Sequence, residues 1–260
     1  MKRTTIRDIA NKAADGQKIT MVTAYDAFSA RLVEQAGIDI ALVGDSVGTT
    51  LQGRNDTLCV DMAAMLYHVE IVARCTQRLL VIGDMPFGSY QVSEDEAVRN
   101  AVAFIKAGAN AVKLEGGASV MPVIERMCEA GIPVMGHLGY TPQSVNITSG
   151  PRVNKSRDEL MEDAESLQDA GVFGLVLEMV PAGVAAEITK ALKIPTIGIG
   201  AGAGTSGQVL VFHDMLGFSP EFNPKFLKRY ANFNEEALKG LRQYKGEVED
   251  GTYPADEHSY

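Results

Sequence analysis

The segment Ala111-Val112-Lys113-Leu114-Glu115-Gly116-Gly117 joins a short apolar run to two closing glycines, which predicts a β-strand that ends abruptly. Successive side chains alternate between the faces of a strand, so Lys113 and Glu115 share one face while Val112 and Leu114 share the other. If both faces are covered, as in a parallel sheet, a cation and an anion project inward near the carboxyl end of this strand. That is where α/β folds place their chemistry.

The alternation of apolar strand and amphipathic helix recurs along the chain. We expect strands at residues 19–25, 40–44, 79–83, 111–115, 133–137, 173–178, 196–200 and 208–212. We expect helices at residues 27–36, 61–74, 94–107, 119–130, 157–170 and 182–192. Four of these helices end in Ala-Gly just before the next strand, where glycine can adopt the left-handed cap that turns the chain back to the sheet.

The expected strands are continuous apolar runs, which is typical of parallel strands covered on both faces. Eight such strands with intervening helices predict an α/β fold, the (βα)₈ TIM barrel, with a doubly wound open sheet as the alternative. Residues 1–14 predict an N-terminal helix, residues 224–245 an additional C-terminal helical part, and residues 246–260 a polar tail. The 260 residues suit one barrel, so we expect a single catalytic domain over residues 1–260.

The composition argues against several classes of protein. A net charge of −9 and the absence of Trp disfavour a nucleic-acid partner. No apolar run reaches membrane-spanning length, and the N-terminal residues lack a secretory apolar core. Three cysteines without zinc-type spacing indicate reduced thiols, so we expect a cytoplasmic protein that binds neither nucleic acid nor membrane.

Polar side chains recur at the expected carboxyl ends of the strands, which line one mouth in a barrel. These residues are Asp26, Asp45, Ser46, Asp84, Lys113, Glu115, His137 and Glu178. Each has a structural alternative: Asp26 or Asp45 could cap a helix, and His137 could be a structural histidine. Lys113 and Glu115 could form an internal ion pair. Carboxylates that follow four different strands nevertheless favour a functional cluster.

Converging carboxylates repel one another, so a divalent cation or a cationic ligand is expected to offset their charge. Oxygen ligands favour Mg²⁺ over zinc, and Mg²⁺ usually takes only one or two protein carboxylates. We expect Asp45 and Asp84 as direct ligands, with Glu115 nearby. A 2-oxo acid could chelate the metal, which would stabilise the enolate formed by proton loss. Lys113 would neutralise negative charge, and Glu178 is the candidate general base.

Two glycine-containing loops invite further hypotheses. Residues 198–204 follow the seventh strand and could bind phosphate through backbone N–H groups, form a tight turn, or approach a flat organic cosubstrate. They do not form a dinucleotide motif, because the acidic partner expected about 20 residues later is missing. Residues 136–144 form a loop after the fifth strand, from which His137 could donate a hydrogen bond to substrate.

Taken together, these stretches resemble the ketopantoate hydroxymethyltransferase family. The matching segments are Thr23-Ala24-Tyr25-Asp26, Val43-Gly44-Asp45-Ser46, Tyr67-His68, Gly83-Asp84-Met85-Pro86-Phe87-Gly88-Ser89-Tyr90, Val112-Lys113-Leu114-Glu115-Gly116-Gly117, Gly136-His137-Leu138-Gly139, Thr141-Pro142-Gln143-Ser144, Leu177-Glu178, Ile197-Gly198-Ile199-Gly200-Ala201-Gly202 and His213-Asp214-Met215-Leu216-Gly217. The resemblance implies a TIM barrel with one Mg²⁺ per subunit, assembled as a homodecamer of two stacked pentamers. It also implies transfer of a one-carbon unit from 5,10-methylenetetrahydrofolate to 3-methyl-2-oxobutanoate, which gives 2-dehydropantoate in pantothenate biosynthesis.

The resemblance also assigns roles by position. Asp45 and Asp84 match magnesium ligands, Glu115 matches a further acidic group at the metal, and Glu178 matches the proposed proton acceptor. The positions that match substrate contacts are Asp45, Ser46, Asp84 and Lys113. Residues 54–59 and 149–156 depart from the family pattern, and we expect them to border the mouth or a subunit contact.

Other functions fit the same residues. A Schiff-base aldolase would use Lys113 as its nucleophile, although the nearby acids would keep this lysine protonated. A Mg²⁺-dependent lyase that acts on a 2-oxo acid is a variant of the first hypothesis. A non-catalytic barrel could bind a small acid, but an acid-rich mouth disfavours carboxylate capture without a metal.

Overall fold

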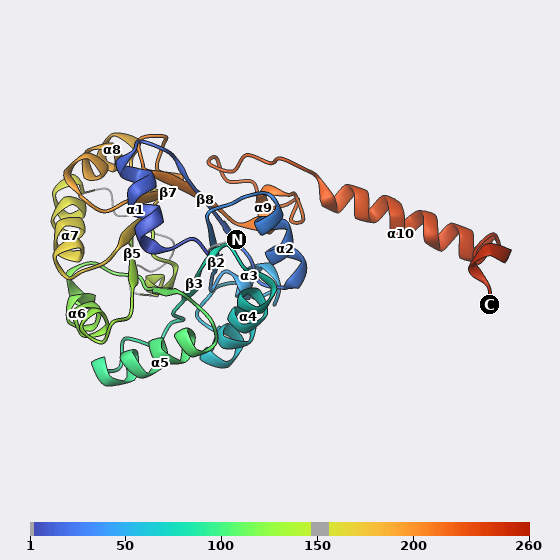
Figure 1. Ribbon diagram of the computed structural model, residues 1–260. Coiled ribbons are helices and arrows are strands. Elements are labelled where there is room, and N and C mark those ends of the chain that lie inside the picture. The colour runs from blue at the N-terminus through green and yellow to red at the C-terminus, as the bar shows by residue number, and fades with distance from the viewer. Residues whose placement is uncertain (1–2, 147–155) are drawn as a thin grey trace. The chain divides into compact units, whose positions relative to one another are not determined.

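The computed structural model describes residues 3–146 and 156–260, and its centre is a closed barrel of eight parallel strands (Figure 1). The strands are β1 Ile19–Thr23, β2 Ile40–Val43, β3 Leu80–Asp84, β4 Ala111–Lys113, β5 Val134–Gly139, β6 Gly174–Glu178, β7 Thr196–Ile199 and β8 Gly207–Leu210. Each strand pairs with the next in sequence, and β8 pairs with β1. The predicted TIM barrel is therefore confirmed, and the open sheet is wrong.

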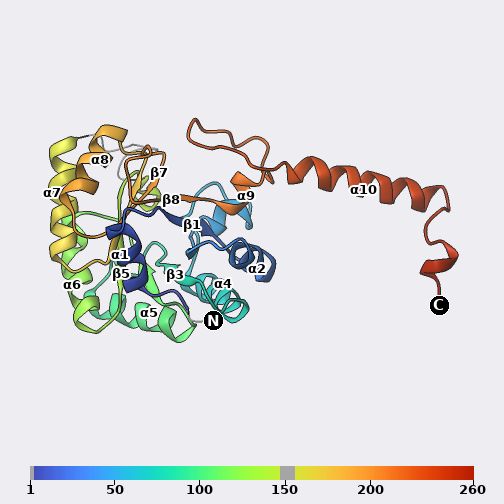
Figure 2. The ribbon, with the colours of Figure 1, turned by 45° about the horizontal axis from the view of Figure 1, so that its top comes forward.

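The helices within residues 1–211 lie around this barrel in both views (Figure 1, Figure 2). The α-helices are α1 Ile6–Ala14, α2 Ala27–Gln35, α3 Val47–Thr50, α4 Met62–Cys75, α5 Glu94–Lys106, α6 Met121–Glu129, α7 Arg157–Asp169, α8 Ala182–Ala191, α9 Phe212–Met215 and α10 Phe233–Glu249. Short 3₁₀ helices are η1 Ala118–Val120, η2 Pro142–Ser144 and η3 Asp256–His258. None of the helices in the described ranges is both long enough and apolar enough to span a membrane.

One of the polar residues at the strand ends has a purely local role. The Asp26 carboxylate accepts hydrogen bonds from the backbone N–H groups of Phe28 and Ser29, and the Ser29 hydroxyl bonds back to the N-cap backbone. This reciprocal capping box starts α2 by satisfying N–H groups that the helix itself leaves free. The structural alternative is therefore correct for Asp26.

The N-terminal helix α1 closes the amino-terminal end of the barrel. Ile9 is 1% exposed and belongs to the apolar cluster that fills the barrel interior. Lys12 Nζ lies 2.7 Å from the carboxylate of Asp39, which immediately precedes β2, and Thr4 N–H donates to the carbonyl of Arg78 before β3. The opposite end, where the strands finish, is consequently the mouth available for chemistry.

Strand β4 is shorter than expected, because Leu114 and Glu115 lie beyond its ladder. The chain still follows β5: Leu114 N–H donates to Met135 O, and Gly116 N–H donates to His137 O. Gly116 has a φ of +131°, a backbone conformation that favours glycine and turns the chain away. Lys113 and Glu115 nevertheless both remain buried, as the alternation predicts.

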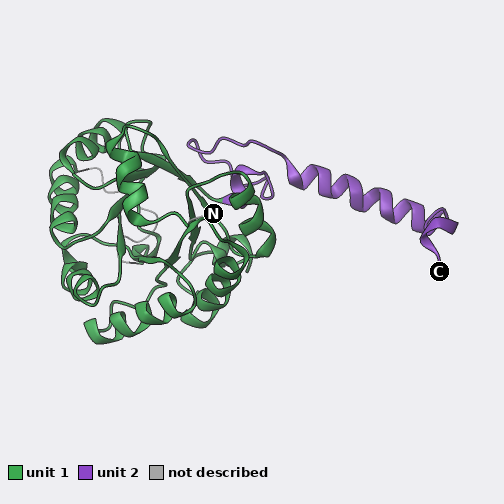
Figure 3. Ribbon diagram, viewed as in Figure 1, with its two compact units in different colours: residues 1–211 green, residues 212–260 purple. Residues whose placement is uncertain are grey.

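The chain divides into two compact units, residues 1–211 and residues 212–260 (Figure 3). The first unit contains the barrel. The second contains α9, α10 and η3, and α10 begins later than the expected start at residue 224. Before it, the Arg229 guanidinium donates to the carbonyls of Pro220 and Phe222, which holds an irregular loop in place of a helical turn. Whether residues 1–260 act as one catalytic domain stays a prediction.

Candidate functional site

Four buried ionisable side chains meet at the mouth, where β2, β3 and β4 end. Asp45, Asp84, Lys113 and Glu115 are each at most 5% exposed. Lys113 Nζ lies 2.6 Å from Asp84 Oδ1 and 3.7 Å from Glu115 Oε1. The lysine thus lies between two acids, which supplies the pairing that buried charges require.

Asp45 joins this group through its backbone and its side chain. Its backbone N–H donates to Asp84 Oδ2 at 3.3 Å, and its own Oδ2 accepts a hydrogen bond from Gln143 Nε2 at 3.0 Å. The next residue, Ser46, places its Oγ 2.7 Å from the hydroxyl of the buried Tyr25. The structure therefore brings Asp45 and Ser46 together with the other residues predicted for the site, and only Asp26 has a separate role.

The electrostatics differ between the acids and the lysine. Burial, reinforced by repulsion from Asp84 and Glu115, raises the pKa of Asp45 to about 8. Burial also raises the pKa of Asp84, although Lys113 opposes this change. For Lys113, burial opposes the charged form, but Asp84 and Glu115 outweigh it and raise its pKa above the ordinary value. A lysine that holds its proton this firmly is a poor Schiff-base nucleophile, which argues against the aldolase.

His137 links the acids to Glu178. The ring is 2% exposed; its Nδ1 lies 3.2 Å from Glu115 Oε1, and its Nε2 lies 3.2 Å from Glu178 Oε2 without the alignment of a hydrogen bond. Burial and the charge of Lys113 oppose protonation, but Glu115 and Glu178 outweigh them and raise the pKa of His137 to about 9. The two carboxylates that flank the ring therefore favour its cationic form. We call the six residues Asp45, Asp84, Lys113, Glu115, His137 and Glu178 the mouth cluster.

The backbone is strained directly after Glu178, the last residue of β6. Met179 has a φ of +54°, the one positive φ of a non-glycine residue among the described ranges. Such a conformation is strained for a residue with a Cβ and recurs at functional sites. Gly139 packs so closely that a Cβ there would lie 2.2 Å from the Glu178 carbonyl oxygen. The ends of β5 and β6 can therefore approach, which brings His137 beside Glu178.

A profile of the ketopantoate hydroxymethyltransferase family matches residues 3–256. The chain belongs to the ketopantoate hydroxymethyltransferase family. It is 51% identical over 259 residues to a 3-methyl-2-oxobutanoate hydroxymethyltransferase of Desulforapulum autotrophicum, with 99% of this chain and 98% of that protein covered. It is 52% identical over 248 residues to the protein of the same name from Thermotoga neapolitana, with 94% and 92% covered.

Solved structures of more distant proteins share the barrel. A 2,3-dimethylmalate lyase of the PEP mutase/isocitrate lyase superfamily superposes with a TM-score of 0.64 at 14% identity, over 100% of this chain and 93% of that one. A phosphonopyruvate hydrolase in complex with oxalate and Mg²⁺ gives 0.63 at 13% identity, over 98% and 93%. At this low identity, the likeness supports the fold alone.

The buried carboxylates of Asp45 and Asp84 could together hold a metal ion. In residues 3–146 and 156–260, no three or more His, Cys, Asp and Glu side chains form a ready-made metal cage. Mg²⁺ does not require one, because it commonly binds one or two carboxylates and retains water. Burial is the main cause that raises the pKa of both aspartates, and repulsion from Glu115 acts in the same direction, so a cation bound beside them would favour their charged forms. The donor set therefore fits Mg²⁺.

Sequence reasoning assigned no role to two buried polar residues that support the mouth cluster. Tyr90 and Gln143 are joined by a hydrogen bond of 2.7 Å from the tyrosine hydroxyl to Gln143 Oε1. Burial raises the pKa of Tyr90 above its ordinary value, with the Glu115 charge acting in the same direction, so the phenol keeps its proton. Tyr90 lies in a loop and Gln143 in the single turn of η2, where no periodicity separates a buried polar side chain from an exposed one.

The glycine-rich loop after β7 is explained by packing. A Cβ on Gly202 would lie 2.5 Å from the Cβ of Ala182, and one on Gly204 would lie 2.7 Å from the Cβ of Ala186. Both alanines belong to α8, so the glycines allow the loop to lie against this helix. The tight-turn interpretation accounts for these two residues, and the cosubstrate interpretation stays a prediction.

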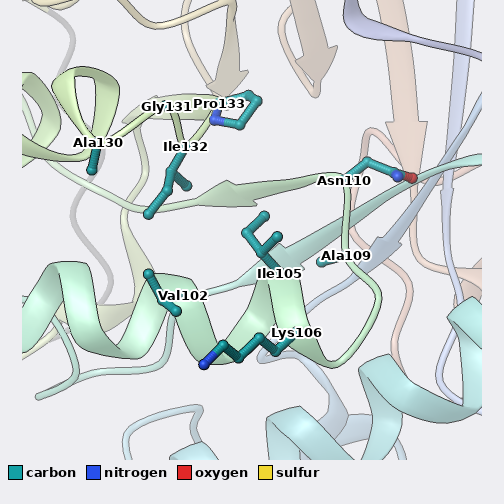
Figure 4. A pocket seen from close by; sticks show the side chains of 9 residues that line it. All are labelled: Val102, Ile105, Lys106, Ala109, Asn110, Ala130, Gly131, Ile132 and Pro133. Atoms are coloured by element: carbon teal, nitrogen blue, oxygen red, sulfur yellow. The ribbon is translucent and has the colours of Figure 1, made fainter.

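An open cavity of about 500 Å³ lies at the other end of the barrel strands (Figure 4). It lies between α5 and α6, and its lining includes Ile105, Lys106, Asn110 and Pro133. Asn110 immediately precedes β4 and Pro133 immediately precedes β5, whereas the mouth cluster follows the strands. The cavity is therefore separate from the mouth cluster.

Two segments of the sequence depart from the family pattern. Residues 54–59 are exposed or only partly buried, except Thr57, and residues 149–155 lie outside the described ranges.

Proposed function

We propose that this chain transfers a one-carbon unit from 5,10-methylenetetrahydrofolate to 3-methyl-2-oxobutanoate, and so makes 2-dehydropantoate and tetrahydrofolate for pantothenate biosynthesis. One observation carries the proposal: the mouth cluster, five of whose six residues are buried, belongs to a chain about half identical, over nearly its whole length, to enzymes named for this activity. The cluster supplies a place for a cation, a fixed positive charge and an accessible acid. A 2-oxo acid that loses a proton next to its carbonyl needs all three.

In this proposal Asp45 and Asp84 hold Mg²⁺, and Glu115 supports the site as a nearby acid. The bound ion would supply Lewis acidity to the carbonyl oxygen of the 2-oxo acid. Lys113 Nζ offsets the negative charge that collects on the substrate, because its contacts with Asp84 and Glu115 keep it protonated. Lys113 therefore acts as a fixed cation.

Glu178 is the proposed general base. Its side chain is 18% exposed, whereas those of Asp84 and Glu115 are 3% and 2% exposed, so a substrate in the mouth can reach it most easily. His137 Nε2 beside it is an N–H donor that lacks a well-aligned acceptor, and it would donate to substrate or hold the Glu178 carboxylate. Ser46, held by Tyr25, would be a further substrate contact.

We propose three wider properties on the same basis. The chain would act as a homo-oligomer, with the decamer of two pentamers that the family resemblance implies. It would work in the cytoplasm, as its free Cys59, Cys75 and Cys128 suggest. Its residues 1–260 would serve as a single catalytic domain. Light scattering coupled to size-exclusion chromatography tests the assembly, since a monomeric active protein would contradict it.

The chemistry is tested by proton NMR of 3-methyl-2-oxobutanoate in D₂O with the purified protein. We expect the methine signal to disappear with Mg²⁺ and to persist in chelator, and product to form only when methylenetetrahydrofolate is added. Exchange that persists in chelator would instead favour imine chemistry at Lys113, which borohydride trapping would detect. Absence of exchange under every condition would overturn the proposed substrate.

A further inference from the structure

Gln143 lies in η2, just beyond β5, and is 4% exposed. Its amide uses its full hydrogen-bonding capacity. Nε2 donates to Asp45 Oδ2 at 3.0 Å and to the Met85 carbonyl at 2.9 Å. Oε1 accepts from the Tyr90 hydroxyl at 2.7 Å and from Gln91 Nε2 at 3.4 Å. A buried amide satisfied in this way is held in a single orientation.

The backbone of Gln143 contacts a second acid of the mouth cluster. Its N–H donates to Glu115 Oε2 at 3.0 Å. The other carboxylate oxygen of Glu115 faces His137 Nδ1 at 3.2 Å. One residue of a short loop therefore connects Asp45, which follows β2, to Glu115, which follows β4.

The orientation of the amide cannot be reversed at this site. A flipped amide would place its oxygen against the Met85 carbonyl, which has no hydrogen to donate, and would lose the hydrogen bond from Nε2 to that carbonyl. The Met85 carbonyl therefore decides which end of Gln143 reaches Asp45, and the hydrogen bond from the Tyr90 hydroxyl to Oε1 holds the amide in that orientation. This contact occupies Oδ2 of Asp45 and fixes the rotation of the carboxyl group, which leaves Oδ1 for a ligand.

We propose that Gln143 is a positioning residue for Asp45, and that it sets the affinity of the mouth cluster for its divalent cation. The inference rests on the proposed function, which makes Asp45 a metal ligand. Groups that hydrogen-bond to a ligating carboxylate orient it, and their loss commonly weakens metal binding by about 10–100-fold. A neutral amide suits this role, because it donates to Asp45 without adding a positive charge that would repel the metal.

Four variants separate positioning from other effects. Gln143→Met keeps the length of the side chain but removes both donors. Tyr90→Phe keeps Gln143 but removes the hydroxyl that donates to its Oε1 and that also bonds the backbone of Glu115. Asp45→Asn removes the proposed ligand itself. Gln168→Met is the matched control, because this partly buried glutamine on α7 bonds to the backbone N–H of Lys193, away from the mouth cluster.

The measurement is Mn²⁺ binding to the full chain without substrate, followed by the electron paramagnetic resonance of the free ion. We expect Gln143→Met to weaken binding by about 10-fold or more, Tyr90→Phe to weaken it less, and Gln168→Met to leave it unchanged. Proton exchange from 3-methyl-2-oxobutanoate then provides a second readout. In Gln143→Met, the Mg²⁺ concentration that gives half-maximal exchange should rise by a larger factor than the maximal exchange rate falls. A general loss of folded protein would instead lower the maximal rate and leave that concentration unchanged.

The outcomes distinguish this inference from the proposed function. If wild type binds Mn²⁺, Asp45→Asn does not, and both Gln143→Met and Tyr90→Phe bind as wild type does, the inference is overturned while the metal site stands. If wild type binds no Mn²⁺, the metal site itself is overturned, and the inference with it. If Gln143→Met does not fold, Tyr90→Phe decides: affinity equal to that of wild type would overturn the role of the Tyr90–Gln143 pair.

Discussion

Lys113 Nζ lies 2.6 Å from Asp84 Oδ1, and both side chains are at most 5% exposed. Removing one partner of such a buried pair leaves the other charge uncompensated in a medium of low polarity. The pair therefore matters to folding as well as to chemistry, and the two roles can be measured separately.

Lys113→Met should lower the free energy of unfolding of the metal-free chain by about 3–5 kcal/mol, because Asp84 loses its cation. Urea unfolding in chelator measures the change. The matched control is Arg74→Met, whose partner Glu70 is as exposed as Arg74 itself, so we expect a change within about 0.5 kcal/mol. Equal losses in the two variants would contradict a stabilising role for the buried pair.

Glu178→Gln should slow proton exchange from 3-methyl-2-oxobutanoate by about 10²–10⁴-fold, because the amide cannot accept the proton. Mn²⁺ affinity should stay near that of wild type, since Glu178 is not a proposed ligand. The measurement is the decay of the methine signal in D₂O at saturating Mg²⁺. Glu187→Gln, an exposed acid on α8 paired with Arg157, is the control. Full exchange in Glu178→Gln would require another base.

Asp214 gives the second unit a pH-dependent stability. Burial raises its pKa to about 6, although Arg229 opposes this. An acid whose pKa is higher in the folded chain favours folding while protonated, and this contribution is lost as pH rises from about 4 to about 6. Asp214→Asn should therefore stabilise the unit by about 1–3 kcal/mol at pH 7.5, and much less at pH 4.

Amide hydrogen exchange of residues 212–218 measures this change locally, because it reports the free energy of opening of that segment. Glu221→Gln, an exposed acid in the same unit, should change protection little at either pH. If Asp214→Asn increased the protection from exchange equally at pH 4 and pH 7.5, ionisation of Asp214 could not be the cause.

Ile9→Ala should cost about 2–5 kcal/mol of stability, because Ile9 is fully buried in the barrel cluster and its loss leaves a cavity. The rate of the catalysed reaction, measured at a low temperature where the variant stays folded, should change little. The reason is that α1 lies at the end of the barrel opposite to the mouth cluster. Thermal unfolding and an activity assay test both statements. Val92→Ala, at a 69% exposed position, should leave stability within about 0.5 kcal/mol.

The barrel was predictable because strands buried on both faces appear in the sequence as continuous apolar runs, and all eight form where these runs occur. The convergence of Asp45, Asp84 and Lys113 followed from the rule that parallel strands end at one mouth. Family membership was expected from the ordered motifs and is confirmed by the match over residues 3–256. The roles of the individual residues stay predictions.

Other features depend on contacts that a single sequence does not display. β4 ends at Lys113, although the chain continues to bond to β5 as far as Gly116, and α10 starts at Phe233, after a loop whose carbonyls bond to Arg229. Gln143 lies in the short helix η2, and only the folded chain brings it to Asp45. The positive φ of Met179 is likewise set by the tertiary structure, since methionine has no preference for it.

The barrel closes when β1 pairs with β8, with Ile19 opposite Gly207 and Val22 opposite Leu210. During synthesis on the ribosome, this seam cannot form until nearly all of the barrel sequence has emerged. Until then the first and latest strands present unpaired edges that can pair with other chains. A fragment truncated before Gly207 should therefore aggregate unless a chaperone binds it. A circular permutant cut in another loop would make a different seam the last to form.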